Sequence, residues 1–135
     1  MKTSKPKLII TWILRLIAAI IMFQTLFFKF TGAEESIYIF SQIGMEPWGR
    51  YLVGVTELIA SVILLTRWYG LGCLMGAGAM SGAIFFHLTK LGIEVQGDGG
   101  YLFALAIIVF VSCSIALLLN FDSNKQQLLS LIKKA

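Results

Sequence analysis

Four of the ionisable side chains within or at the edges of long apolar stretches of the sequence are candidates for chemistry. They are Arg15, Lys29, Glu57 and His87. In an apolar environment, each of them needs an ion-pair partner, a hydrogen-bond partner or access to water. An ammonium, a carboxyl and an imidazole that meet in such a place can hold a polar ligand or transfer a proton. Lys29, Glu57 and His87 are therefore the candidate ligand or proton site, provided that their helices bring all three to one cavity.

Glu57 belongs to the run GVTELIASVILL and shares a helix face with Gly54 and Ser61. This small and polar face is expected to point toward other helices. Two interpretations stay open: Glu57 is a buried structural carboxyl, or it faces a ligand or handles protons. Arg15 is a candidate partner for Glu57 in a structural intramembrane ion pair, or it extends toward the membrane surface.

Lys29 follows Arg15 by 14 residues, which places the two side chains about 40° apart around one helix. One face of that helix therefore carries a basic residue near each end. The ammonium of Lys29 either faces the site or extends to the membrane surface.

His87 is the only histidine of the sequence, and it ends a helical stripe of small residues. The stripe consists of Gly72, Gly76, Ala79 and Ala83. The same segment contains two GxxxG patterns, GCLMG and GAMSG, which favour close helix contact. His87 is thus either a hydrogen-bonded structural residue or a ligand or proton site. Because no second histidine or nearby cysteine accompanies it, no metal site is predicted.

Four apolar runs, at about residues 8–28, 48–66, 68–88 and 101–119, must position these side chains. Each run has about the 20 residues that a helix needs to cross a hydrocarbon layer of about 30 Å. A hydrophobic content of 58% and a mean hydropathy of +0.85 exclude an ordinary soluble domain. Residues 1–135 are therefore predicted to form a single all-α integral membrane domain, a bundle of four transmembrane helices.

The distribution of basic residues predicts that both termini are cytoplasmic, because this topology places seven basic residues inside and three outside. The inner residues are Lys2, Lys5, Lys7, Arg67, Lys125, Lys133 and Lys134, and the outer ones are Lys29, Arg50 and Lys90. No basic stripe with interleaved aromatic residues remains, so nucleic acid is not a predicted partner. Cys73 and Cys113 form no CxxC motif and are expected to be small packing residues.

The connecting segments predict further elements. In the segment TGAE, Thr31 and Glu34 have capping-box spacing, so a short interfacial helix is expected between spans one and two. Asp98 is placed to cap the fourth span. The tail at 121–135 combines lysines with leucines and is predicted to form an amphipathic helix on the cytoplasmic membrane surface.

Three segments are more specific than the hydropathy pattern: TLFFKFTGAEES, EPWGRY and MSGAIFFHLTKLGIEVQGDGG. With Arg15, Lys29, Glu57 and the small-residue third span that ends at His87, they resemble the DoxX family of small four-span bacterial membrane proteins. The resemblance runs from about Arg15 to Leu119. It implies a four-helix membrane fold and a multi-pass location in the bacterial cytoplasmic (inner) membrane.

The family takes its name from a subunit associated with thiosulfate:quinone oxidation, and relatives are linked to membrane redox systems or to assisting other membrane proteins. The resemblance thus implies an accessory subunit of a quinone-linked redox system, with quinone as candidate cofactor and a membrane oxidoreductase as candidate partner. The isolated chain is not expected to be an enzyme. One alternative is a non-enzymatic assembly factor or helix-packing partner for another membrane protein. Another is a small-solute transporter that acts as a homo-oligomer.

Overall fold

The structure is a computed structural model that describes residues 4–134. Its elements are the helices α1 (Lys5–Thr31), α2 (Glu34–Gln42), α3 (Trp48–Leu64), α4 (Tyr69–Phe86), α5 (Tyr101–Leu119) and α6 (Phe121–Lys134), with a π-helical turn, η1 (His87–Leu91), directly after α4. No strand occurs among residues 4–134. The predicted all-α class is therefore confirmed.

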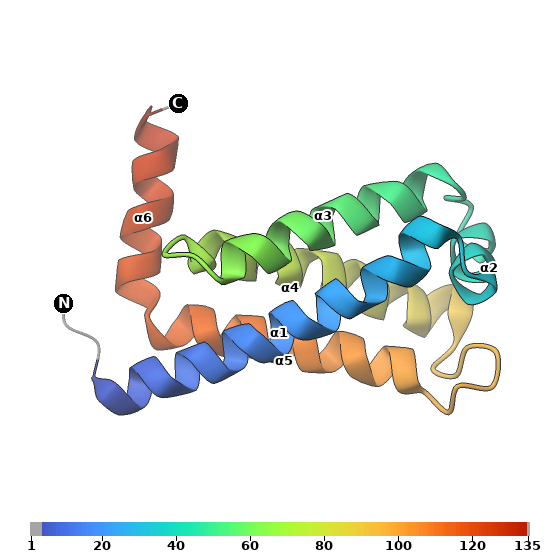
Figure 1. The fold of residues 1–135 in the computed structure, drawn as a ribbon, viewed down its shortest axis with the longest axis horizontal. Coiled ribbons are helices and arrows are strands. Elements are labelled where there is room, and N and C mark those ends of the chain that lie inside the picture. The colour runs from blue at the N-terminus through green and yellow to red at the C-terminus, as the bar shows by residue number, and fades with distance from the viewer. Residues whose placement is uncertain (1–3, 135) are drawn as a thin grey trace.

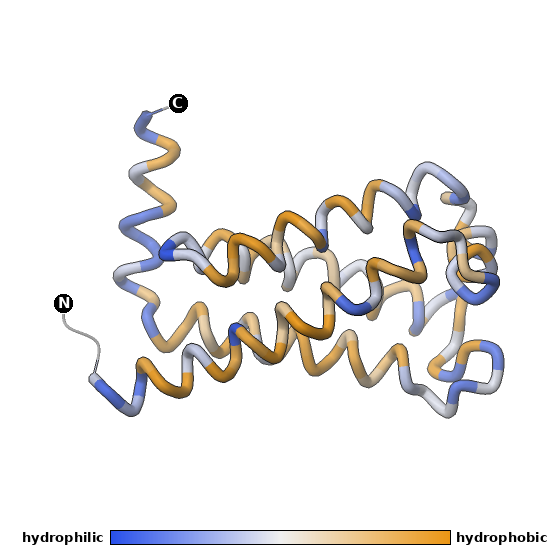
Figure 2. The backbone as a smooth tube through the Cα atoms, in the orientation of Figure 1, coloured by the Kyte–Doolittle hydropathy of each residue, from blue (hydrophilic) through white to orange (hydrophobic). Residues whose placement is uncertain are grey.

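Three helices are long and apolar enough to cross a membrane: Lys5–Thr31, Tyr69–Leu91 and Tyr101–Leu119. They correspond to the first, third and fourth predicted spans, and the apolar character of the long helices is visible in Figure 2. α3 lies where the second span is predicted, but it has only 17 residues, or about 26 Å of helix. That α3 crosses the membrane stays a prediction.

The four long helices lie side by side, each antiparallel to its neighbours (Figure 1). α1 packs against α3 and α5, and α4 packs against the same two helices. The shared core consists mainly of small or flexible side chains: Ala18, Ala19, Met22, Ala60, Leu64, Cys73, Met80, Ala106, Val109, Cys113 and Ala116. Large apolar side chains such as Ile20, Phe27 and Leu118 point outward and are 64–68% exposed. An outer surface of this kind is suited to contact with lipid.

Close contact between α3 and α4 depends on Gly72. A Cβ atom on Gly72 would lie 2.9 Å from the backbone nitrogen of Leu64 and 3.1 Å from the carbonyl oxygen of Ala60. Because the obstacle is backbone, no side chain can move aside to make room. The first GxxxG pattern, Gly72 and Gly76, therefore packs inside the chain's own bundle.

The two ends of the bundle differ. One end, called here the α2 end, carries α2 and the loop between η1 and α5. The other, the α6 end, carries the start of α1 and the helix α6, which runs crosswise to the long helices (Figure 1). The first turn of α6 is fixed by buried Asn124, whose Nδ2 donates to the Leu117 carbonyl oxygen at 3.2 Å. Gly70 leaves room for this side chain, because a Cβ there would lie 2.7 Å from the Asn124 Oδ1. The predicted tail helix is thus present and attached at its first turn.

The predicted capping box at Thr31 is wrong. Thr31 is the last residue of α1, and its hydroxyl donates to the Phe27 carbonyl oxygen at 2.5 Å. α2 begins after Ala33 without a side-chain cap. α1 continues beyond the apolar run, so Thr31 ends one helix instead of starting the next. Asp98 does accept hydrogen bonds from the backbone N–H groups at the start of α5, as expected of a capping residue.

Candidate functional site

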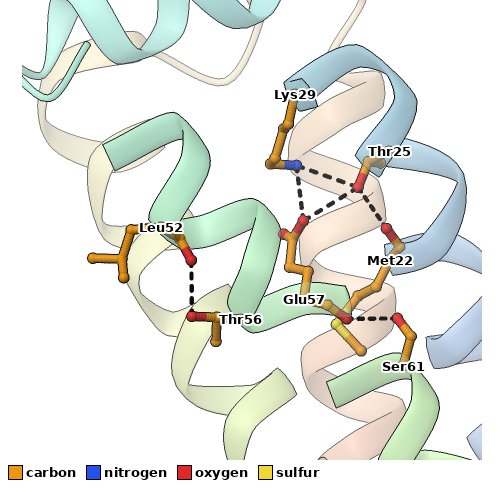
Figure 3. Close-up of polar contacts among 7 residues, drawn as sticks. All are labelled: Met22, Thr25, Lys29, Leu52, Thr56, Glu57 and Ser61. Carbon is orange, nitrogen blue, oxygen red and sulfur yellow. Dashed lines mark hydrogen bonds and ion pairs between the residues drawn. The ribbon is translucent and has the colours of Figure 1, made fainter. Parts of the chain in front are cut away.

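An ion pair between Lys29 and Glu57 joins α1 to α3. The Nζ of Lys29 lies 3.0 Å from the Oε2 of Glu57, and the two side chains are 15% and 4% exposed. Figure 3 shows both pointing into the space between the two helices. The structure therefore brings together two of the three predicted site residues.

Thr25, one turn before Lys29, completes this cluster. Its hydroxyl accepts a hydrogen bond from the Lys29 Nζ at 3.2 Å. The hydroxyl proton can be donated to the Met22 carbonyl oxygen at 2.9 Å or to the Glu57 Oε2 at 3.4 Å (Figure 3). A hydroxyl that can donate to either acceptor links the charged pair to the helix backbone. Sequence reasoning missed Thr25, although its spacing of four residues from Lys29 places both on one helix face.

The face of α3 around Glu57 has the small and polar character predicted from the sequence. Ser61 is buried, and its hydroxyl donates to the Glu57 carbonyl oxygen at 2.7 Å. Gly54 accommodates the ring of Phe30 from α1, because a Cβ on Gly54 would lie 2.9 Å from that ring. The close approach of α1 and α3 brings Lys29 within reach of the carboxylate. An ion pair in this setting is favourable only while both partners are present, because a single charge left in hydrocarbon is costly.

Arg15 does not form the predicted ion pair with Glu57. Its Nε donates to the Leu64 carbonyl oxygen at 2.6 Å, and its Nη2 donates to the Thr66 carbonyl oxygen at 2.8 Å. The guanidinium also lies 3.7 Å from the ring centroid of Trp12 and 4.3 Å from that of Tyr69. Arg15 thus caps the C-terminal end of α3, where cations are favoured.

The axial offset of α1 and α3 explains why Arg15 does not reach Glu57. Glu57 lies level with Thr25 and Lys29, and Thr25 is ten residues, or about 15 Å, farther along α1 than Arg15. An arginine side chain cannot cover that distance.

At the α2 end, Arg50 performs for α1 the role that Arg15 performs for α3. Its Nη1 donates to the Lys29 carbonyl oxygen at 2.5 Å. Its Nε and Nη2 bind the Glu46 carboxylate at 2.8–3.0 Å. The spacing of four residues between Glu46 and Arg50 was a usable sequence signal for this pair. The backbone of Lys29 is therefore fixed by α3 beside its ion-paired side chain.

Among the described residues, His87 forms no hydrogen bond or ion pair with the cluster of Thr25, Lys29 and Glu57. It is buried at the start of η1, its Nδ1 lies 2.9 Å from the Gly92 carbonyl oxygen, and its ring contacts Phe103 of α5 at 5.5 Å between centroids. Because a carbonyl only accepts, the Nδ1 carries the proton in this contact. Within residues 4–134, the hydrogen bond of His87 thus goes to the loop after η1 and not to Lys29 or Glu57. The described residues also contain no group of three His, Cys, Asp or Glu side chains that could hold a metal ion.

Comparison with known proteins identifies one relationship. The model of the DoxX family matches residues 10–89, which is more than half of the chain and covers most of α1, all of α2, α3 and α4, and part of η1. No curated protein and no solved structure matches the chain. The matched segment contains Arg15, Lys29, Glu57 and His87.

Proposed function

The chain belongs to the DoxX family, and we propose that this multi-pass membrane protein is an accessory subunit of a quinone-linked redox system that contacts quinone beside Lys29 and Glu57. The observation that carries the proposal is the 3.0 Å ion pair of these two residues between apolar helices, with Thr25 bonded to both. Charged groups in hydrocarbon are costly and are typically kept for function.

The topology that we propose has four spans, with α3 as the second. The α6 end then faces the cytoplasm of a bacterial cell, and the α2 end faces outward. The excess of basic residues predicted at the cytoplasmic side favours this orientation. The Lys29–Glu57 pair then lies in the outer half of the membrane, where a quinone dissolved in lipid can reach it.

The chemistry of the cluster suits a quinone. A quinone offers carbonyl oxygen atoms that accept hydrogen bonds, and the Lys29 ammonium, which donates to Thr25 at 3.2 Å and pairs with Glu57 at 3.0 Å, carries three N–H donors. Lys29 retains 15% exposure and Glu57 only 4%, so the ligand approaches from the lysine side. When a partner oxidoreductase supplies two electrons, the quinone must also take up two protons. The ammonium of Lys29 is placed to donate one of them, and water at its exposed side supplies the second proton and then reprotonates the Lys29 amine.

Extraction of bound lipids tests the proposal. The protein is purified in mild detergent from cells that contain quinone, and quinone is quantified per protein after solvent extraction. The expected result is quinone in a fixed ratio to protein that persists through repeated detergent washes. Loss of quinone to background level while the helical protein remains intact would reject the proposal.

A second candidate function, packing against helices of another membrane protein, is favoured by a specific observation. Gly78 and Gly82 form the second GxxxG pattern, and a Cβ atom on either would meet nothing within 4 Å. Unlike Gly72 and Gly76, they are free to receive another helix. Cysteine crosslinking distinguishes the two patterns: a crosslinker at position 78 should capture a second chain, and one at position 76 should not. If position 78 also yields only contacts within the chain, the assembly role is rejected.

A further inference from the structure

A hollow of about 350 Å³ lies at the α6 end, between α6 and the turn that joins α3 to α4. We call it the Arg67 notch, and its lining residues are Arg67, Tyr69, Ser123, Asn124, Gln126, Gln127 and Ser130. The volume lies at the small end of the range of ligand sites, about 300–1,000 Å³. The lining differs from the rest of the bundle, because most of its residues have polar side chains.

The groups in the notch suit a phosphate. Arg67 is exposed and lies beside the ring of Trp68, with 5.4 Å from its Cζ to the ring centroid. Hydroxyl and amide groups that can donate hydrogen bonds line the opposite wall, on α6. A guanidinium surrounded by such donors is a typical recognition site for phosphate.

The start of α4 adds to the attraction for an anion. α4 begins at Tyr69 in the lining of the notch, and its N-terminal end has no side-chain cap. The N-terminal end of a helix carries partial positive charge and free backbone donors. Asp122 lines a neighbouring hollow that shares Ser123 and Gln126 with the notch, and it is not part of the notch lining itself.

The position of the notch at the ends of the apolar helices favours a lipid as the source of that phosphate. It lies where the long apolar helices end, and Leu65, two residues before Arg67, is 51% exposed. The crosswise α6 exposes Leu129 and Ile132, which is typical of a helix lying in the membrane interface. A ligand in the notch can therefore keep its headgroup among polar groups while its acyl chains lie along the helices.

We propose that the Arg67 notch binds the headgroup phosphate of an anionic phospholipid. Arg67 forms the ion pair with the phosphate, and the side-chain amide of Gln127 on α6 donates to a remaining headgroup oxygen atom. The Ser130 hydroxyl donates to the Gln127 carbonyl oxygen at 2.6 Å and lines the notch beside it. The bound lipid then connects α6 to the α3–α4 turn beyond the attachment provided by Asn124.

The test is native mass spectrometry of the full chain released from detergent, titrated with phosphatidylglycerol or with phosphatidylcholine. The wild type is expected to retain one phosphatidylglycerol in preference to phosphatidylcholine. Arg67→Gln is expected to weaken phosphatidylglycerol binding by at least about fivefold, the size expected for one basic residue near a membrane surface. Lys133→Gln, which removes the same charge at the far end of α6, serves as the matched control and should change binding less.

A neutral variant separates a built site from general attraction between charges. Gln127→Met keeps the net charge and the approximate size of the side chain, and it is expected to weaken phosphatidylglycerol binding while circular dichroism remains that of the wild type. Equal weakening by Arg67→Gln and Lys133→Gln, with no effect of Gln127→Met, would overturn the proposal in favour of unspecific attraction. If inorganic phosphate displaces the lipid completely, the notch is a site for free phosphate. This result would also overturn the proposal.

Discussion

Arg15 and Arg50 hold reciprocal positions on the antiparallel helices α1 and α3: each guanidinium donates to carbonyl oxygen atoms at the C-terminal end of the other helix. Arg15 binds Leu64 and Thr66, and Arg50 binds Lys29. The last carbonyl groups of a helix lack partners within the helix. The two arginines supply these partners, and they fix the register of the two helices that carry the Lys29–Glu57 pair.

Replacing Arg15 by methionine should destabilise the protein because it leaves two carbonyl groups at the end of α3 without their donors. The expected loss is about 1–3 kcal/mol, the cost of leaving the buried Leu64 carbonyl without a partner, since Thr66 is exposed and its carbonyl can bind water. Arg15→Lys should recover little of it, since an ammonium cannot reproduce the planar fork that binds both oxygen atoms. The measurement is the thermal unfolding midpoint in detergent. Lys90→Met, a change at an exposed basic residue, is the control and should leave the midpoint nearly unchanged.

Removing one partner of the Lys29–Glu57 ion pair should lower the stability of the fold more than expected from the effect of removing both. Lys29→Met or Glu57→Gln alone leaves one polar partner in apolar surroundings, and loss of one member of a buried pair typically costs about 3–5 kcal/mol. The double variant Lys29→Met/Glu57→Gln should be more stable than the sum of the single effects predicts, with a coupling energy of about 1–3 kcal/mol. Additive effects in this double-mutant cycle would show that the two charges do not interact in the folded protein.

Gly72 and Gly82 should respond differently to the same substitution. Gly72→Ala introduces a Cβ against the backbone of α3, whereas Gly82→Ala introduces one into open space. Gly72→Ala is expected to lower the unfolding midpoint strongly. Gly82→Ala is expected to leave the free energy of unfolding within about 0.5 kcal/mol of the wild type, the usual range for surface changes. Similar destabilisation by both variants would contradict the packing described for the two GxxxG patterns.

Asp98 should make the stability depend on acidic pH. Partial burial raises the pKa of Asp98, but hydrogen bonds from the backbone N–H groups of Val95, Gly100 and Leu102, together with His87, keep it below the ordinary value of 3.8. A carboxyl whose folded pKa is lowered contributes stability above its unfolded pKa, about 3.9, and loses that contribution as the pH falls through the folded pKa. Unfolding midpoints of the wild type should therefore drop below about pH 4 more steeply than those of Asp98→Asn. Parallel pH profiles for the two proteins would contradict this assignment.

The sequence predicted the helices better than the contacts between them. Hydropathy and the small face of α3 correctly indicated that Glu57 points into the bundle. The partner of Glu57 depends on how far α1 is shifted along α3. Periodicity does not define this shift, and so the sequence predicts Arg15 as a candidate partner where the structure has Lys29. The contacts of His87 depend on a π-helical turn and on Gly92, whose φ of +80° is a local backbone feature without a clear signal in the sequence.

The most direct test of the quinone proposal compares quinone affinity between the wild type and the double variant Lys29→Met/Glu57→Gln, in which neither partner is left as an unpaired charge. Both proteins are titrated with a short-chain quinone in lipid nanodiscs, and binding is followed by quenching of tryptophan fluorescence. The proposal predicts saturable binding to the wild type and at least about tenfold weaker binding to the variant, the effect of losing about 1.4 kcal/mol of interaction. Equal affinity in two equally well folded proteins would contradict the assignment of the quinone site to Lys29 and Glu57.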